Sequence, residues 1–181
     1  MDQATDQDVQ RLLDGGRRRE AFECLIEHYQ HKVFRLCFSI LGDEAAAEDA
    51  AQDTFLKAWR GLPGFRGDAA LPTWLYSIAR NTCLTRSQRG AGRAEELLTE
   101  GTAASRLIPI DDSLDVRAAI ARLPGRYRQA LLLFYFEGKS YEEVSAMLDL
   151  PLGTVKTYLH RARKELAASF RQSATEVKHG V

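Results

Sequence analysis

The sequence predicts an all-α fold of two small helical domains joined by a flexible linker. Apolar residues recur three and four positions apart in successive segments, and none shows the sustained apolar-polar alternation typical of a β-strand. The helical segments are 21–41, 44–62, 72–88, 115–122, 125–137, 141–149 and 152–170. Residues 90–113 are rich in Gly, Ala, Ser and acids and lack an apolar stripe, as is typical of a linker. We therefore expect one domain over residues 1–89, a second over 114–171, and a tail over 172–181.

Composition excludes several classes of protein. The chain has 181 residues, of which 45% are hydrophobic, and its 25 basic side chains balance its 25 acidic ones. No apolar run approaches the roughly 18 residues that a membrane span needs, and the acidic start MDQATDQDVQ differs from a secretory signal. The three cysteines, at 24, 37 and 83, cannot form a fully paired disulfide framework. We expect a cytoplasmic protein with reduced thiols and no direct membrane insertion.

The charges are unevenly distributed along the chain. Residues 1–53 carry 6 basic and 12 acidic side chains, whereas residues 54–93 carry 7 and 1. Residues 94–112 are acidic again, and residues 113–181 are basic. The two basic blocks can attract a polyanion, and an acidic surface can bind a basic protein partner.

The C-terminal part has helix-turn-helix spacing. The tetrapeptide SYEE at 140–143 is an S-x-x-E capping box that starts a short helix, and a long helix follows it. On the long helix, apolar residues from Val155 to Leu166 share one side, and the opposite side carries cations and hydrogen-bonding groups. That opposite side consists of Lys156, Thr157, His160, Arg161 and Lys164. Such a face suits a recognition helix in the major groove, whereas Arg126 and Arg128 on an earlier helix suit phosphate contacts.

The N-terminal part combines an acidic helix face with a stretch of aromatic residues and cations. The acidic face, on the helix over 44–62, comprises Glu48, Asp49, Gln52 and Asp53. The aromatic residues are Trp59, Phe65, Trp74 and Tyr76, and the cations among them are Lys57, Arg60, Arg66, Arg80, Arg86 and Arg89. Aromatic rings stack on unpaired bases and Arg binds phosphates, so this surface can hold a nucleic-acid single strand. The alternatives are an ordinary solvated acidic surface and tryptophans that belong to the core.

Three stretches of the chain resemble bacterial sigma-70 factors of the extracytoplasmic function (ECF) group. DEAAAEDAAQDTFLKAWR and FRGDAALPTWLYSIARNTCLTRSQR, at 43–60 and 65–89, are similar to region 2 of that family. LPGRYRQALLLFYFEGKSYEEVSAMLDLPLGTVKTYLHRARKEL, at 123–166, is similar to region 4. The resemblance implies a sigma factor that binds core RNA polymerase and directs promoter-specific transcription initiation. It implies that region 4 reads the −35 element of promoter DNA as duplex and region 2 reads the −10 element as a single strand.

The resemblance also implies roles for individual residues. The family motif that binds the clamp helices of the polymerase β′ subunit falls on Asp49, Gln52, Asp53 and Phe55. Those at the −10 position are Trp74, Tyr76, Arg80 and Asn81, with Phe65 and Arg66 in the adjoining loop. Those at the −35 position are Lys156, Thr157, His160 and Arg161, to which we add Lys164 and Arg126. The resemblance further implies contact between residues 131–136 and the polymerase β flap, and an anti-sigma factor as a partner.

Other functions have less support in the sequence. Cys24, His28 and His31 stand at i, i+4 and i+7 and are zinc-ligand types, but no fourth ligand is evident, so we expect no metal. No nucleophile with its base, P-loop or dinucleotide motif is present, so we expect neither an enzyme nor a cofactor. The main alternative is a helix-turn-helix transcriptional regulator that binds DNA as a dimer without being a polymerase subunit. A pure interaction module, such as an anti-sigma protein, would lack the cationic helix face.

Overall fold

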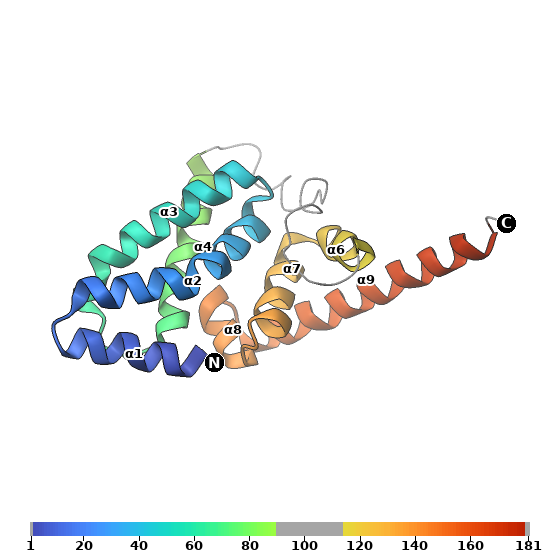
Figure 1. Cartoon of the computed structure of the whole chain (residues 1–181). Coiled ribbons are helices and arrows are strands. Elements are labelled where there is room, and N and C mark those ends of the chain that lie inside the picture. The colour runs from blue at the N-terminus through green and yellow to red at the C-terminus, as the bar shows by residue number, and fades with distance from the viewer. Residues whose placement is uncertain (1, 90–113, 180–181) are drawn as a thin grey trace.

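The computed structural model describes residues 2–89 and 114–179, and every regular element within these residues is a helix (Figure 1). The N-terminal group comprises α1 (Asp2–Asp14), α2 (Arg18–Leu41), α3 (Glu44–Gly61), the 3₁₀ turn η1 (Leu62–Gly64) and α4 (Leu71–Arg89). The C-terminal group comprises α6 (Leu114–Ala121), α7 (Gly125–Leu131), the π-helical turn η3 (Leu132–Phe136), α8 (Tyr141–Leu148) and α9 (Leu152–His179). The all-α prediction is confirmed. The predicted linker over 90–113 lies outside the described residues.

The sequence pattern did not predict α1. This helix has few apolar residues, but one of them, Val9, is fully buried. The Tyr29 hydroxyl of α2 donates a hydrogen bond to Asp6 Oδ1 of α1 at 2.5 Å. Packing against α2 therefore stabilises a helix whose own periodicity is weak.

Small residues let α3 lie close to its neighbours in the N-terminal group. Its buried face consists of Ala47, Ala50, Ala51, Thr54 and Ala58. The buried side chains of α2 and α4, the two helices that α3 packs against, are larger and include Leu25, Tyr29, Val33, Leu75 and Tyr76. Since alanine has high helix propensity and little volume, the same residues favour the helix and permit the close packing.

The helix-turn-helix has the capping box that the sequence predicts. Glu143 N–H donates to Ser140 Oγ at 3.1 Å, and Ser140 N–H donates to Glu143 Oε2 at 2.8 Å. At the other end of α8, Asp149 adopts a left-handed conformation with φ of 50° and stops the helix. α9 begins directly after Pro151 and packs against both α7 and α8.

Replacing Ser140 with Ala is expected to lower the free energy of unfolding by about 1 kcal/mol, because α8 loses the side-chain acceptor at its first turn. Urea denaturation followed by circular dichroism measures the change. Ser140→Thr keeps a hydroxyl acceptor and should lose less. Equal losses for the two variants would contradict a capping role for the Ser140 side chain.

The segment 125–137, predicted as one α-helix, changes its winding halfway. After α7, the Glu137 N–H donates to Leu132 O at 3.1 Å, which is the five-residue spacing of a π-helix. Leu132 and Leu133 point into the core, whereas the side chains of Tyr135 and Phe136 are 51% and 38% exposed. The wider turn directs Glu137 away from solvent toward the N-terminal group.

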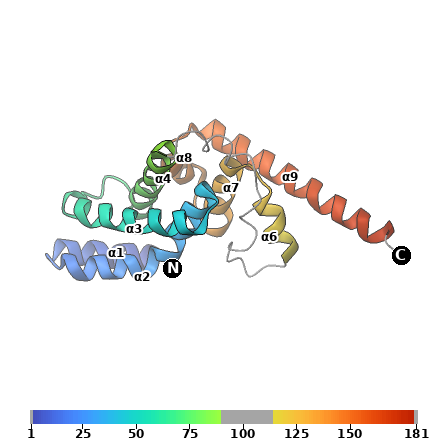
Figure 2. The same ribbon diagram turned by 90° about the horizontal axis from the view of Figure 1, so that it is seen from above.

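The two helical groups pack against each other. In Figures 1 and 2, α7 lies beside α2 and α8 lies beside α4. Arg128 of α7 is buried at this contact, where it donates to Ser39 O at 2.9 Å and to Ala121 O at 2.8 Å. The prediction that Arg128 contacts phosphates is therefore wrong for this conformation, because the guanidinium is bonded to backbone carbonyls. Burial lowers the pKa of Arg128.

The last helix runs beyond its predicted end at residue 170. The backbone of α9 stays helical to His179, which includes part of the predicted tail, and its C-terminal half projects from the rest of the molecule (Figure 1). Arg, Gln, Ala, Glu and Lys in this stretch all favour the helical state. Within the described residues, no helix is both long and apolar enough to cross a membrane.

Candidate functional surfaces

The N-terminal half of α9 has two distinct sides. Val155, Leu159 and Ala162 are buried against α7 and α8. The residues on the solvent side are Lys156, Thr157, His160, Arg161 and Lys164, and all of them are exposed. The structure therefore brings the candidate −35 residues of α9 together on one accessible face, with the geometry that a recognition helix needs.

Two tyrosines lie beside the arginines of this face. Arg161 Nη1 donates to the Tyr127 hydroxyl at 3.2 Å, and this hydrogen bond raises the pKa of Arg161. The Arg126 guanidinium lies over the rings of Tyr127 and Tyr158, at 5.4 and 6.0 Å from their centroids. The hydrogen bond places the Arg161 guanidinium beside Tyr127 of α7. Arg126 is exposed beside it.

Trp74 and Phe65 form an aromatic pair where the turn after α3 meets α4. Their ring centroids are 5.1 Å apart, and both side chains are half-buried. A Cβ at Gly61 would lie 3.1 Å from Trp74 Cζ2, so glycine at that position gives the indole its room. The neighbouring Arg66 is exposed. This pair with an adjacent cation is the part of the candidate −10 surface that a base can reach.

The other candidate −10 residues lie near or under the helix-turn-helix. Tyr76 is fully buried, where its hydroxyl donates to Glu137 Oε2 at 3.2 Å. Arg80 Nη1 lies 3.9 Å from Asp149 Oδ2, at the end of α8. Asn81, one position further along α4, is exposed. In this conformation the structure does not bring all of these residues onto one accessible surface.

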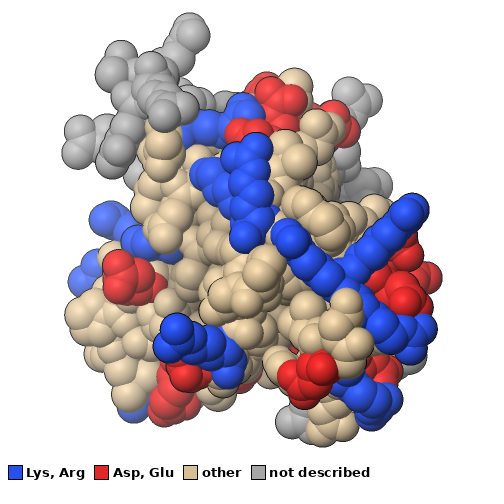
Figure 3. All heavy atoms as spheres, turned by 90° about the vertical axis from the view of Figure 1, so that its left-hand side faces the viewer, with Lys and Arg blue, Asp and Glu red and all other residues tan. Residues whose placement is uncertain are grey.

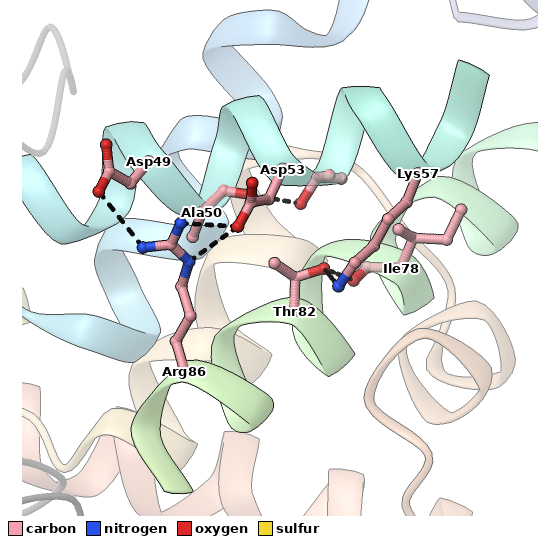
Figure 4. Close-up of polar contacts among 8 residues, drawn as sticks. Asp49, Ala50, Asp53, Lys57, Ile78, Thr82 and Arg86 are labelled. Carbon is pink, nitrogen blue, oxygen red and sulfur yellow. Dashed lines mark hydrogen bonds and ion pairs between the residues drawn. The ribbon is translucent and has the colours of Figure 1, made fainter. Parts of the chain in front are cut away.

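The acidic face of α3 is partly neutralised from within the molecule (Figure 4). Arg86 of α4 donates to Asp53 Oδ2 at 2.6 Å through Nη2 and to Asp49 Oδ2 at 3.3 Å through Nη1. The hydrogen bond to Asp53 is the main cause of a raised pKa for Arg86. Arg86 therefore belongs to the α3 and α4 contact, although the sequence pattern grouped it with the cations for a single strand.

Lys57 is a second cation that turns toward the contact between α3 and α4. Its Nζ donates to Thr82 Oγ1 at 2.9 Å, and the Thr82 hydroxyl donates to Ile78 O at 2.8 Å (Figure 4). The contact between Lys57 and Thr82, like that between Arg86 and Asp53, joins positions that are more than twenty residues apart in the sequence. Local patterning could therefore not show that the charged groups of Arg86 and Lys57 are bonded within the molecule.

An apolar groove of about 730 Å³ lies between α2 and α3, next to the acidic face. Its lining residues are Arg19, Phe22, Glu23, Ile26, Gln52, Phe55, Leu56 and Trp59. Phe22 and Trp59 pack with ring centroids 5.0 Å apart, and the Arg18 guanidinium lies 4.0 Å from the Trp59 centroid. Two candidate polymerase-binding residues, Gln52 and Phe55, thus line a concave apolar surface. A groove of this size can take up several side chains of a partner helix.

Sequence reasoning missed Leu56, which is 55% exposed at this groove. A signal was present, because at 100° per residue Leu56 falls opposite Ala47, among the polar residues of α3. A large apolar side chain on an otherwise polar helix face is a common mark of a binding site. Trp59, assigned to the single-strand surface by its position, lines the same groove.

The three cysteines occupy apolar surroundings. Cys37 and Cys83 are buried, and Cys24 is half-buried. A hydrogen bond with Cys83, together with burial, raises the pKa of the Cys37 thiol, and burial raises that of Cys24. Since the thiolate is the reactive form, these pKa directions disfavour redox chemistry. Among the residues that the structure describes, no three His, Cys, Asp or Glu side chains gather as a metal site would require.

One end of the molecule carries several exposed arginines. Figure 3 shows it from the side where α1 joins α2 and α3 ends, with an uncharged surface around which Lys and Arg lie interspersed with Asp and Glu. Arg17 and Arg66 lie in the connecting segments, Arg60 lies in the last turn of α3, and all three are exposed. The uncharged surface and these arginines are compatible with a strand of nucleic acid that runs past the Phe65 and Trp74 pair.

Comparison with known proteins finds matches for both helical groups. Residues 25–93 match the family model for sigma-70 region 2, and residues 113–166 match that for sigma-70, region 4. The RNA polymerase sigma-H factor of Pseudomonas aeruginosa is 37% identical over 174 residues, which cover 87% of this chain and 89% of that protein. The ECF RNA polymerase sigma-E factor of Salmonella typhimurium is 36% identical over 184 residues, which cover 91% and 94%. Among solved structures, the sigma factor RpoE in complex with the anti-sigma factor NepR, from Bartonella quintana, has a TM-score of 0.68 at 25% identity, covering 83% of this chain and 96% of that one.

Proposed function

The chain belongs to the extracytoplasmic function (ECF) group of the sigma-70 family, and we propose that it is the subunit with which core RNA polymerase finds and opens its promoters. It is a sigma factor that directs promoter-specific transcription initiation, and the helix-turn-helix regulator is not favoured. The observation that carries this function is the exposed cationic side of α9, within the part of the chain that matches region 4. We assign a surface to each of three tasks: reading the −35 element, capturing the −10 element and binding the polymerase.

We assign reading of the −35 element to α9. Lys156, Thr157, His160 and Arg161 lie on the exposed half of the helix that would enter the major groove. Cations there can donate to the acceptors of guanine, and the Thr157 hydroxyl can meet a base edge or a phosphate. Lys164 and Arg126, at the edges of this face, suit phosphates, which position the helix without reading sequence.

We assign capture of the −10 element to the surface around Phe65, Arg66 and Trp74. The exposed edges of the aromatic pair can stack with an unpaired base, and the adjacent Arg can bind the backbone. Capturing unstacked bases draws the DNA toward the melted state, so strand opening needs no chemical step by this chain. Asn81 extends the surface along α4. We propose that catalysis stays with the polymerase and that this chain is not an enzyme.

We assign binding of the polymerase β′ clamp helices to the groove between α2 and α3 and to its acidic border. Gln52 and Phe55 line the groove, and Asp49 and Asp53 lie on the adjoining side of α3, where they pair with Arg86 of α4. An amphipathic helix can place its apolar face in such a groove while its cations meet the carboxylates. The exposed Tyr135 and Phe136 of η3 offer a second apolar surface, which suits the β flap.

Leu56→Glu is expected to lower the affinity for core polymerase about tenfold, about 1.4 kcal/mol, because a charge would enter the apolar groove on binding. The exposed side chain contributes little to the fold, so the melting temperature should stay unchanged. Titration of core polymerase into labelled sigma factor measures the affinity. Phe170→Glu, at an exposed apolar residue on α9, is the matched control, and an equal loss there would contradict the groove assignment.

Partners and organisation follow from the same assignments. We propose that the promoter-binding units correspond to residues 1–89 and 114–171, and that the protein works in the cytoplasm with the polymerase. The solved relative RpoE was captured with an anti-sigma factor, NepR. We propose that an anti-sigma factor likewise restrains this chain. Tethering two DNA readers to one polymerase raises the effective concentration of the second promoter contact once the first has formed.

Size-exclusion chromatography with bacterial core RNA polymerase, followed by transcription from a pool of genomic fragments, tests the function. Co-elution and new discrete start sites are expected, and the sequences upstream of those starts will supply the promoter specificity. Core polymerase without this chain is the control. Failure to co-elute with core polymerase of the same organism, together with binding of palindromic duplex DNA by the free protein, would indicate the regulator instead.

A further inference from the structure

Arg18 is the first residue of α2, and none of the surfaces assigned so far explains a cation at this position. The amide groups at the start of a helix carry a partial positive charge, so a guanidinium is unfavourable there. Within the described residues no carboxylate pairs with Arg18, and its buried Nε has no hydrogen-bond partner. The neighbouring Arg17, by contrast, forms an ion pair with Glu20. The reason for a cation at this position therefore lies in what the side chain of Arg18 reaches.

The side chain of Arg18 reaches the last turn of α3, where its Nη2 donates a hydrogen bond to Trp59 O. In a continued helix the donor to this carbonyl would be the N–H of residue 63, four positions later. Residue 63 is proline, which has no N–H, so the helix itself cannot supply the donor. A cation at the end of a helix also meets the negative end of the helix dipole. Arg18 is thus favourably placed with respect to α3, although not with respect to α2.

The same guanidinium lies over the aromatic ring of Trp59, 4.0 Å from the ring centroid. Phe22 packs on the indole as well, with the two ring centroids 5.0 Å apart. Phe22 and Trp59 both line the apolar groove between α2 and α3, whereas Arg18 is not among the lining residues. Arg18 therefore contacts a wall of the groove without being part of its surface.

We propose that Arg18 is a positioning residue for polymerase binding, which holds the Trp59 ring in place as a wall of the groove before the partner helix arrives. The inference rests on the proposed binding of polymerase in that groove. It adds a residue that lies outside residues 25–93, the part of the chain that matches region 2. A ring that is already held loses less conformational freedom when a partner packs on it, and this favours binding. Arginine suits the task because its planar group can stack on an indole while its N–H groups donate to a carbonyl.

This arrangement makes the effect of Arg18 on polymerase depend on Trp59. Without Arg18 the indole can adopt other rotamers, and Trp59 O has lost its donor. In a chain with alanine at position 59 there is no ring to hold, so removal of Arg18 should cost no further affinity. Two substitutions that act on one contact are not additive, and this separates a positioning role from a direct contact with the polymerase.

The first test compares binding of core polymerase by the full-length chain with Arg18→Met, Arg18→Lys, Trp59→Ala and the double variant of Arg18→Met with Trp59→Ala. Titration of core polymerase into labelled protein measures the affinity, and thermal unfolding establishes that each variant retains its helices. Met keeps the unbranched apolar stem, whereas Lys keeps the charge without the planar group. Arg11→Met is the matched control, because it removes an arginine from an exposed ion pair within α1. Arg18→Lys also serves as the test variant if Arg18→Met loses its helices.

The second test observes the ring itself by tryptophan fluorescence. The chain has two tryptophans, so a Trp74→Phe background leaves Trp59 as the single indole emitter. Acrylamide quenching in this background, without polymerase or DNA, measures how well the indole is shielded. Arg18→Met should raise the quenching constant, and Arg11→Met should leave it unchanged. An unchanged quenching constant in Arg18→Met would overturn the proposal.

We expect Arg18→Met to weaken polymerase binding about fivefold, Arg18→Lys about threefold and Trp59→Ala about tenfold. The double variant should match Trp59→Ala, and Arg11→Met should match the unmodified chain. Full affinity in Arg18→Lys would overturn the stacking role, because charge alone would then be sufficient. A double variant that binds clearly more weakly than Trp59→Ala would overturn it as well, because Arg18 would then contact the polymerase directly.

Leu56→Glu separates failure of this proposal from failure of the groove assignment. If Leu56→Glu weakens polymerase binding and Arg18→Met does not, the groove assignment stands and the role of Arg18 is overturned. If neither variant changes the affinity, the groove does not bind polymerase, and the role of Arg18 is overturned together with the groove assignment. Losses in both variants, with the double variant equal to Trp59→Ala, would support both.

Discussion

Charge reversal of Asp49 and Asp53 to Lys is expected to lower the affinity for core RNA polymerase at least about hundredfold, about 3 kcal/mol. Both carboxylates lie on the side of α3 where Arg86 of α4 binds them, next to the groove residue Gln52 in the sequence, and the proposed basic partner surface would approach them there. Reversal removes two attractive contacts and adds repulsion, which raises the dissociation rate as well as slowing association. The side chains are 64% and 42% exposed, so the fold should lose no more than about 1 kcal/mol.

The contact with Arg86 requires a specific control. Lys at both positions would repel Arg86, so the double variant could lose affinity through a disturbed α3 and α4 contact. Adding Arg86→Glu restores the ion pairs with their signs exchanged. The triple variant should regain thermal stability but not polymerase affinity, as measured by titration and by calorimetry. Recovery of affinity together with stability would mean that the two acids act through Arg86 and do not face the polymerase.

Arg161→Ala is expected to weaken holoenzyme binding to the −35 element by about ten- to hundredfold, within the 1–3 kcal/mol typical of a base-reading arginine. The guanidinium lies on the exposed side of α9, where Tyr127 holds it. Association with core polymerase should not change, because neither surface that we assign to polymerase, the groove between α2 and α3 or the exposed side chains of η3, includes Arg161. Anisotropy titrations of holoenzyme with promoter duplexes recovered from the transcription pool measure the loss. A parallel loss of polymerase binding would contradict the assignment.

Two further variants separate the role of Arg161 from general electrostatics. Arg163→Ala removes the same charge two residues away, from a side chain that donates to Leu159 O, and should cost much less affinity. Tyr127→Phe keeps the ring but removes the hydroxyl that accepts from Arg161, and it should give a loss smaller than that of Arg161→Ala. Suppose instead that all three variants lose the same affinity, and that the loss disappears at high salt. This result would mean that the face binds phosphates without reading bases.

The helices were largely predictable from local patterns, with two instructive exceptions. Apolar spacing located α2, α3, α4, α8 and α9, and the capping box at 140–143 located the start of α8. α1 was missed because a single buried valine gives little periodicity, and its partner α2 supplies the missing stabilisation. The π-helical turn η3 was missed because apolar residues at 131–136 fit an ordinary helix equally well. Glu137, the residue that follows it, bonds to Arg35 and Tyr76 of the N-terminal domain, and no local pattern reports these contacts.

The candidate site was less predictable than the helices. The recognition face of α9 follows from helical geometry alone, because the angle of each residue around the helix axis determines the face on which it lies. Arg86, Arg128 and Tyr76 look equally suited to nucleic acid in the sequence, yet each is engaged within the molecule. Their partners, respectively Asp53, Ser39 and Glu137, lie more than thirty residues away. No local pattern reports such distant contacts.

Short-range information was enough for the fold class, the helix-turn-helix and the exposed cationic side of α9. These features depend on dihedral preferences, capping and helical period, all of which act within a few residues. Only the packed structure shows which charged groups and aromatic rings remain accessible. It also shows that Leu56 forms part of a groove. Burial and ion pairing are settled where distant segments meet, and there desolvation requires each buried charge to find a partner.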